Sequence, residues 1–184
     1  MSNPMSQYLS TIQRALEAGN ATEHTHRPAL KTLLEALAPG VTATNEPQHI
    51  ACGAPDSVVT RAGLTVGYVE GKEVGKALDV AERSPEVKRY RESLDNLLLA
   101  DYLEFRWYVN ETRVQSASLA QPDVAGRVKA SRRGLEAARE LLVTFLEGKP
   151  EPVQTPGEVN HGSEQKRHWL YHLLPAGGGT KELD

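Results

Sequence analysis

The sequence predicts a mixed α/β domain whose sheet has about four or five strands flanked by helices. Amphipathic stretches with apolar residues at helical spacing lie at both ends of the chain's first 150 residues. Between them lie short runs rich in β-branched and aromatic residues, separated by turn signals. The resulting order is helix, helix, strand, hairpin, helix, strand pair, helix, which is typical of mixed layers of helices and sheet.

Two helices are expected before the first strand. Residues 6–18 carry apolar side chains near helical spacing, and residues 30–37 do so again. Thr22 is a suitable N-cap for the second helix, which Pro39-Gly40 ends.

The central elements are expected to be short. Residues 41–44 form a first β-prone run, and residues 56–60 and 64–70 form a pair of strands separated by Arg61-Ala62-Gly63. Ser84 and Pro85 are suited to the N-cap and first position of a helix that runs to about Leu94. Strands over residues 97–99 and 104–109 and a helix over residues 131–147 complete the domain.

Composition excludes several classes of protein. The single cysteine, Cys52, rules out a disulfide framework within the chain. No signal peptide and no run of about 18 apolar residues are present, so we expect a cytoplasmic protein without a membrane span. The formal net charge of −3 gives no global signal for nucleic acid, although a local basic stripe can suffice.

Three charged residues stand at the ends of the two central strands. Asp56 opens the first strand, and Glu70 and Lys72 close the second. Side chains alternate faces along a strand, so Glu70 and Lys72 point the same way. A two-residue loop, Ala62-Gly63, would put Asp56 on the opposite face from Glu70, whereas a three-residue loop would put all three on one face. We expect the three-residue loop, because Gly63 suits the left-handed position that ends it.

Two carboxylates and one ammonium on one face suit phosphodiester hydrolysis. Mg²⁺ binds protein oxygen through one or two carboxylates and keeps several waters. Asp56 and Glu70 are therefore expected to hold Mg²⁺, with the carbonyl of Gly71 as a further ligand. Lys72 is expected to orient water and to offset charge in the transition state.

The pattern Pro55-Asp56 followed by Glu70-Gly71-Lys72 resembles the PD-(D/E)XK nuclease signature. From about residue 21 to residue 110 the chain resembles the N-terminal nuclease region of type ISP and type IIG restriction–modification enzymes, which join a nuclease to an adenine methyltransferase. The stretches that carry this likeness are TEHTHRPAL (22–30), NEPQHI (45–50), GAPD (53–56), YVEGK (68–72) and KRYRESL (88–94).

The resemblance implies a restriction-endonuclease-like fold and a Mg²⁺-dependent DNA endonuclease with Asp56, Glu70 and Lys72 as the catalytic set. It also implies that Glu23, on the first core helix, assists. Some members of the family have a glutamine four residues before the tyrosine that corresponds to Tyr90, and this chain has Glu86 at that position. No GxxxxGK[ST] loop and no methyltransferase motif is present. Methyltransferase and translocase parts are therefore expected partners.

Further DNA contacts are expected from the helix that begins near Pro85, through Lys88, Arg89, Tyr90 and Arg91. Ordinary alternatives exist for each site residue. The Glu–Lys pair could be a solvated strand edge, Glu23 could meet the helix dipole, and Tyr90 could pack in the core.

The expected organisation is an N-terminal helix (1–20), a nuclease domain (21–148), and a linker with a poorly ordered tail (149–184). Cleavage of both DNA strands by one site is expected to need two copies of the chain. The alternatives are an inactive DNA-binding or interaction module, separated from a larger restriction–methyltransferase enzyme, and an unrelated α/β protein with a chance motif.

Overall fold

The computed structural model describes residues 3–47, 50, 52–123 and 127–148. The helices are α1 (Pro4–Glu17), α2 (Glu23–Leu37), α3 (Leu78–Ala81), α4 (Pro85–Ser93) and α5 (Arg132–Glu147). The strands are β1 (Val41–Asn45), β2 (Ser57–Arg61), β3 (Leu64–Gly71), β4 (Asn96–Ala100), β5 (Glu104–Val109), β6 (Thr112–Ser118), β7 (Ala120–Pro122) and β8 (Val128–Ala130). The linker and tail predicted over residues 149–184 lie outside the described residues.

Six strands form one mixed sheet in the order β1-β2-β3-β4-β5-β6. β3 and β4 run parallel and the other neighbours antiparallel, while β7 and β8 form a separate pair. The predicted α/β class is confirmed, and the architecture is compatible with a restriction-endonuclease-like fold. The sheet exceeds the expected four or five strands because β6 adds an edge strand whose largely exposed residues give a weak strand pattern.

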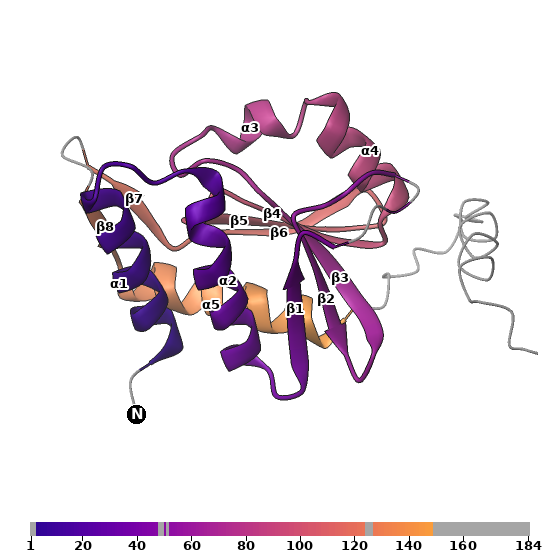
Figure 1. Ribbon diagram of the computed structural model, residues 1–184, viewed down its shortest axis with the longest axis horizontal. Coiled ribbons are helices and arrows are strands. Elements are labelled where there is room, and N and C mark those ends of the chain that lie inside the picture. Colours follow the sequence, from indigo (N-terminus) through magenta and orange to yellow (C-terminus); the bar gives the residue numbers. More distant parts are fainter. Residues whose placement is uncertain (1–2, 48–49, 51, 124–126, 149–184) are drawn as a thin grey trace, which may run out of the picture. The chain divides into compact units, whose positions relative to one another are not determined.

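Helices cover both faces of the sheet, and Figure 1 shows α3 and α4 above strands β4–β6 and α5 below them. All five residues of β4 are buried, as expected for a strand covered on both faces. Leu98 and Ala100 join the larger core with α1, α2 and α5. Leu97 and Leu99 join the smaller core with α3 and α4. The alternation along β4 therefore fixes which helices lie on which face.

The predicted helix starts are confirmed. The backbone N–H of the N-cap Thr22 donates to the hydroxyl of Thr25 (2.9 Å) at the start of α2. Ser84 caps α4 by accepting a hydrogen bond from the backbone N–H of Val87 (3.2 Å), with Pro85 at the first position. The Ser84 cap satisfies a helix N–H group that has no partner within the helix.

The expected three-residue loop between β2 and β3 is wrong. Arg61 pairs with Leu64, so the loop is Ala62-Gly63, and both residues have positive φ (50° and 79°). Such a turn matches the right-handed twist of the flanking strands, which is why two-residue loops favour it.

A β-bulge puts Asp56 and Glu70 on one face of the sheet, as predicted, but in a different register from the one that a three-residue loop would give. Val59 pairs with Gly67 but Thr60 pairs with Thr65, so Val66 has no partner in β2. Beyond this extra residue the register continues to Ser57 opposite Val69. If this register is extended by one residue, Asp56 lies opposite Glu70. The prediction that the two acidic residues meet therefore holds for a different reason than expected.

No helix among the described residues is long and apolar enough to cross a membrane.

Candidate active site

The charged residues predicted from the sequence gather where β2 begins and β3 ends. The carbonyl of Asp56 accepts a hydrogen bond from the backbone N–H of Glu46 (2.8 Å), just beyond β1. The start of α2 approaches the same place, because Arg27 contacts both residues. Three strands and one helix N-terminus thus position the site.

Both carboxylate oxygens of Asp56 are engaged within the chain. Oδ1 accepts a hydrogen bond from Nη2 of Arg27, and Oδ2 accepts one from the backbone N–H of Gly71 (2.7 Å). The side chain of Asp56 is 13% exposed. Asp56 is therefore fixed against the end of β3 by a backbone donor and neutralised by an arginine.

Glu70 and Lys72 form a buried ion pair, with Nζ of Lys72 2.6 Å from Oε1 of Glu70. Their side chains are 5% and 12% exposed. Lys72 also donates to Oε2 of Glu86 (3.1 Å), the residue that replaces the glutamine of some similar sequences. The second oxygen of Glu70, Oε2, is buried and has no hydrogen-bond partner.

The site disfavours negative charge. Burial, followed by the charge of Asp56, raises the pKa of Glu70 to about 7, although Lys72 opposes this. Burial also raises the pKa of Asp56, although the Gly71 N–H and Arg27 oppose it. Burial favours neutral Lys72, but its hydrogen bonds to Glu70 and Glu86 outweigh this and raise its pKa. Asp56 and Glu70 therefore hold a proton to a higher pH than ordinary carboxyl groups do, while Lys72 stays protonated.

Gly71 leaves space that another side chain fills. A Cβ atom on Gly71 would collide with the hydroxyl of Tyr102. Tyr102 is buried and has a left-handed backbone (φ 68°), an uncommon conformation for a residue with a side chain. The carboxylate of Asp101 supports this turn by accepting hydrogen bonds from the backbone N–H groups of Leu103 (3.0 Å) and Gly75 (3.2 Å).

Arg27 and Tyr102 belong to the site, although neither residue was predicted from the sequence to do so. The predicted residue Glu23 contacts Arg27 (3.2 Å) one helical turn away. The spacing of four residues between Glu23 and Arg27 could have indicated that Arg27 lies beside Glu23, because residues four apart are neighbours on a helix surface. No local signal indicates Tyr102, since its position depends on the turn between β4 and β5.

The four residues predicted to contact DNA lie on α4 and differ in exposure. Lys88 and Arg89 are exposed, while Tyr90 is 2% exposed and packs in the smaller core. Nε of Arg89 donates to the carbonyl of Cys52 (2.6 Å). Arg91 donates to the carbonyl of Glu111. Their DNA contacts remain predictions, and of the four side chains only Tyr90 is buried.

The donor set fits a magnesium ion in its chemistry. Asp56 and Glu70 supply carboxylate oxygens, and Oε2 of Glu70 is buried without a partner. In the arrangement described, Arg27 occupies Oδ1 of Asp56. Across the described ranges, no group of three or more His, Cys, Asp or Glu side chains is arranged to hold a metal. The residues fit the ion, and Arg27 would compete with it for the carboxylate of Asp56.

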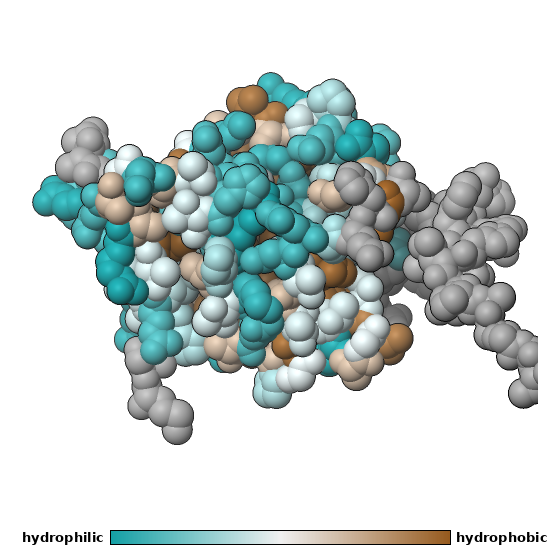
Figure 2. Space-filling view, viewed as in Figure 1, coloured by the Kyte–Doolittle hydropathy of each residue, from teal (hydrophilic) through white to brown (hydrophobic). Residues whose placement is uncertain are grey.

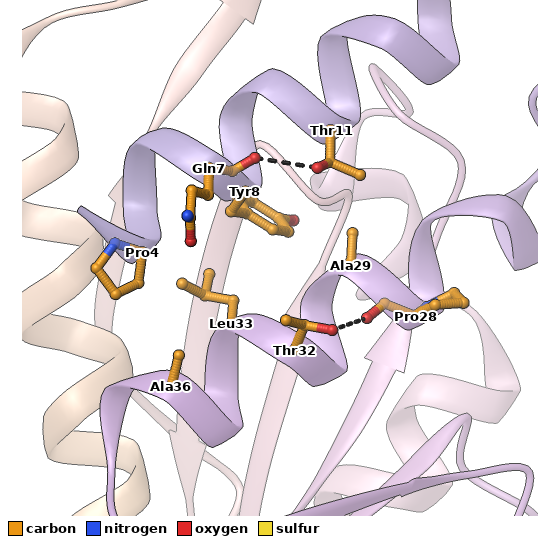
Figure 3. Close-up of a pocket in the computed structure, with 9 residues that line it drawn as sticks. All are labelled: Pro4, Gln7, Tyr8, Thr11, Pro28, Ala29, Thr32, Leu33 and Ala36. Atoms are coloured by element: carbon orange, nitrogen blue, oxygen red, sulfur yellow. Dashed lines mark hydrogen bonds between the residues drawn. The ribbon is translucent and has the colours of Figure 1, made fainter. Parts of the chain in front are cut away.

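The pocket in Figure 3 is a separate feature between α1 and α2. Its lining residues are Pro4, Gln7, Tyr8, Thr11, Pro28, Ala29, Thr32, Leu33 and Ala36. Its two threonine hydroxyls donate to carbonyls of their own helices. It therefore offers few free polar groups for binding or catalysis.

Figure 2, in the orientation of Figure 1, shows hydrophilic residues gathered over α2 and β1, and hydrophobic residues in small separate patches.

Comparison with solved structures supports the fold. A chain in the cryo-EM structure of a DrdV–DNA complex matches with a TM-score of 0.62 and 21% sequence identity. The match covers 80% of the present chain and 14% of the DrdV chain, so this protein spans about a seventh of that longer chain. No protein-family model and no curated protein matches.

Proposed function

We propose that this chain is a Mg²⁺-dependent DNA endonuclease domain of the kind found in type ISP and type IIG restriction–modification enzymes. The observation that carries the proposal is the meeting of Asp56 and Glu70 beside the buried ammonium of Lys72. The fold adds support, because it is shared with a chain found in a DNA complex.

Each residue has a distinct role in this reaction. Asp56, Glu70 and the carbonyl of Gly71 would hold Mg²⁺, and the bound ion would supply Lewis acidity for phosphodiester hydrolysis. Lys72 stays protonated, so it acts by donating hydrogen bonds to charge that develops on the phosphate rather than by accepting a proton. Glu23 assists from α2 through its contact with Arg27. Lys88, Arg89 and Arg91 would guide the DNA backbone.

The test is cleavage of supercoiled plasmid by the purified chain with Mg²⁺. Wild type is expected to nick the plasmid, and EDTA is expected to stop it. Asp56→Ala and Lys72→Ala are expected to be inactive, with circular dichroism showing that both variants fold. Equal cutting by all three proteins would refute the proposal.

A second candidate is a module that binds DNA or a partner without cutting. It is favoured by the match to only 14% of the longer DrdV chain. In this case the chain would work together with methyltransferase and translocase parts of a restriction–modification system. It predicts DNA binding that does not depend on Asp56, and no nicking at any Mg²⁺ concentration.

A further inference from the structure

Arg27 lies where three carboxylates converge. Its guanidinium contacts Asp56, Glu23 (3.2 Å) and Glu46 (3.1 Å). The Arg27 side chain is 10% exposed, whereas those of Glu23 and Glu46 are 28% and 73% exposed. The arginine is thus buried against Asp56 and reaches the surface through its other two partners.

One donor of Arg27 lacks a hydrogen bond, which points to a second arrangement of this side chain. Its Nε is buried without a partner, as is Oε2 of Glu70. A buried polar atom without a hydrogen bond is costly, so such atoms in a native site call for an explanation. Here one donor and one acceptor in the same charged site are both left unpaired.

A divalent cation and the guanidinium of Arg27 would compete for the carboxylate of Asp56. Oδ2 is held by the backbone N–H of Gly71, and Oδ1 by Arg27. A divalent cation at Oδ1 would lie next to the guanidinium of Arg27, and the repulsion between their positive charges favours movement of the arginine away from this oxygen. Glu23 and Glu46 can keep Arg27 bound after it leaves, because each already contacts it.

We propose that Arg27 is an internal counter-cation that sets the metal affinity of this site. It neutralises Asp56 in the metal-free protein and gives up Oδ1 when a divalent cation binds, while Glu23 and Glu46 retain it. The inference rests on the proposed metal-dependent function. Arg27 is a positioning residue here, since it acts through Asp56.

Titration calorimetry with Mn²⁺ and with Mg²⁺ tests this directly. Arg27→Gln is expected to bind Mn²⁺ at least about tenfold more tightly than wild type, because a competing positive charge next to Asp56 is gone. The matched control is Lys31→Gln, one turn further along α2, whose ammonium pairs with Glu35 rather than Asp56. This control is expected to bind like wild type.

Each outcome separates the two proposals. Equal affinity of Arg27→Gln and wild type would overturn the role of Arg27 and leave the metal site standing. An equal gain in Lys31→Gln would also overturn it, because the effect would then come from helix charge alone. If wild type and Arg27→Gln both fail to bind either ion, the role of Arg27 and the proposed function fall together.

A measurement on the wild-type protein keeps the inference testable if Arg27→Gln does not fold. The side-chain Nε–H signal of Arg27 can be followed by NMR in protein labelled with ¹⁵N-arginine and identified by its loss in Arg27→Lys. We expect this signal to shift as Mg²⁺ saturates the site. An unchanged Arg27 signal at saturation would overturn the inference.

Discussion

Two clusters of charged side chains in the described part of the chain differ in how well their charges are balanced. The candidate site gathers Arg27, Asp56, Glu70 and Lys72. The second cluster, here called the Arg106 cluster, lies where β5 meets α3 and comprises Asp79, Glu82, Glu104, Arg106 and Arg113. Both place a buried basic side chain among carboxylates.

The Arg106 cluster is electrostatically satisfied. Arg106 contacts Asp79 (2.6 Å), Glu82 (3.1 Å) and Glu104 (2.6 Å). Its hydrogen bond and charge lower the pKa of Asp79. Burial acts to raise the pKa of Glu82, but hydrogen bonds from Tyr108 and Arg106 outweigh it and lower this pKa. Among the described residues, no buried side-chain atom of this cluster lacks a partner.

The candidate site shows the opposite pattern. The pKa values of Asp56 and Glu70 are raised mainly by burial, and two buried atoms, Nε of Arg27 and Oε2 of Glu70, have no partner. Strained electrostatics of this kind is typical of sites that bind a ligand, whereas balanced clusters hold structure together. The contrast between the two clusters is therefore consistent with the proposed role of the first in binding a ligand and of the second in stability.

The largest expected effect is on catalysis. Lys72→Met should lower the rate of Mg²⁺-dependent nicking by about 10²–10³-fold, because a donor to the developing phosphate charge is lost. Arg106→Met should leave the rate per folded molecule within about threefold, since its cluster lies on other elements. Plasmid nicking rates, normalised to folded protein, measure both. A comparable loss in the two variants would erase the distinction.

The next effect is on stability, where Arg106→Met is expected to be more damaging than Lys72→Met. Arg106→Met should lower the free energy of unfolding by about 2 kcal/mol, because Glu82 and Glu104, whose side chains are 18% and 34% exposed, lose their contacts with the guanidinium. Lys72→Met should cost less, because Glu70 can take up a proton near neutral pH. Urea unfolding at pH 7 in EDTA gives both values. A smaller loss for Arg106→Met than for Lys72→Met contradicts this expectation.

A pH dependence should distinguish the site further. The pKa of Glu70 rises from 4.5 to about 7 on folding, so the folded state binds the proton more tightly. Its contribution to stability is therefore complete below pH 4.5 and is lost as pH rises through about 7.

The matching variant is Glu70→Gln, which keeps an acceptor for Lys72 without the titration. In EDTA it should be more stable than wild type at pH 8 by about 1–3 kcal/mol. That difference should vanish near pH 4.5, the ordinary pKa of the glutamate. Unfolding midpoints across this range measure it, and a constant difference would remove Glu70 as the titrating group.

The smallest effect concerns the contact between Gly71 and Tyr102. Gly71→Ala should cost about 1–3 kcal/mol, because its Cβ collides with the tyrosine hydroxyl. Tyr102→Phe removes that hydroxyl, so the double variant should lose less than the sum of the two single variants. Thermal unfolding of the four proteins gives the coupling, and strict additivity would show that the two residues act independently.

Much of the fold could be predicted from the sequence because its signals are local. Thr22, Ser84 and Pro85 mark helix starts, and alternating apolar runs mark β2, β3 and β5. β6 escaped prediction because its residues are largely exposed. The length of the hairpin loop was predicted wrongly, since Gly63 is compatible with either length and the bulge at Val66 has no clear sequence signal.

The site could be predicted in part for the same reason. Asp56, Glu70 and Lys72 share adjacent strands, so their spacing along the chain carried the information. Arg27 and Tyr102 reach the site from α2 and from the turn after β4. The spacing between Glu23 and Arg27 indicates only that these two residues are neighbours, and the contacts that Arg27 and Tyr102 make with the strands cannot be read from spacing. Their part in the electrostatics emerged only from the folded arrangement.

The unpaired residue at Val66 has a consequence for length variation in this hairpin. Deleting Val66 would remove the extra residue of β3 and leave a regular hairpin with the same two-residue loop, in which Asp56 still lies opposite Glu70. Deleting one residue of β2 would instead bring Asp56 opposite Val69 and turn the two acidic side chains to opposite faces of the sheet. Related sequences should therefore lose the extra residue of β3 freely but keep the length of β2.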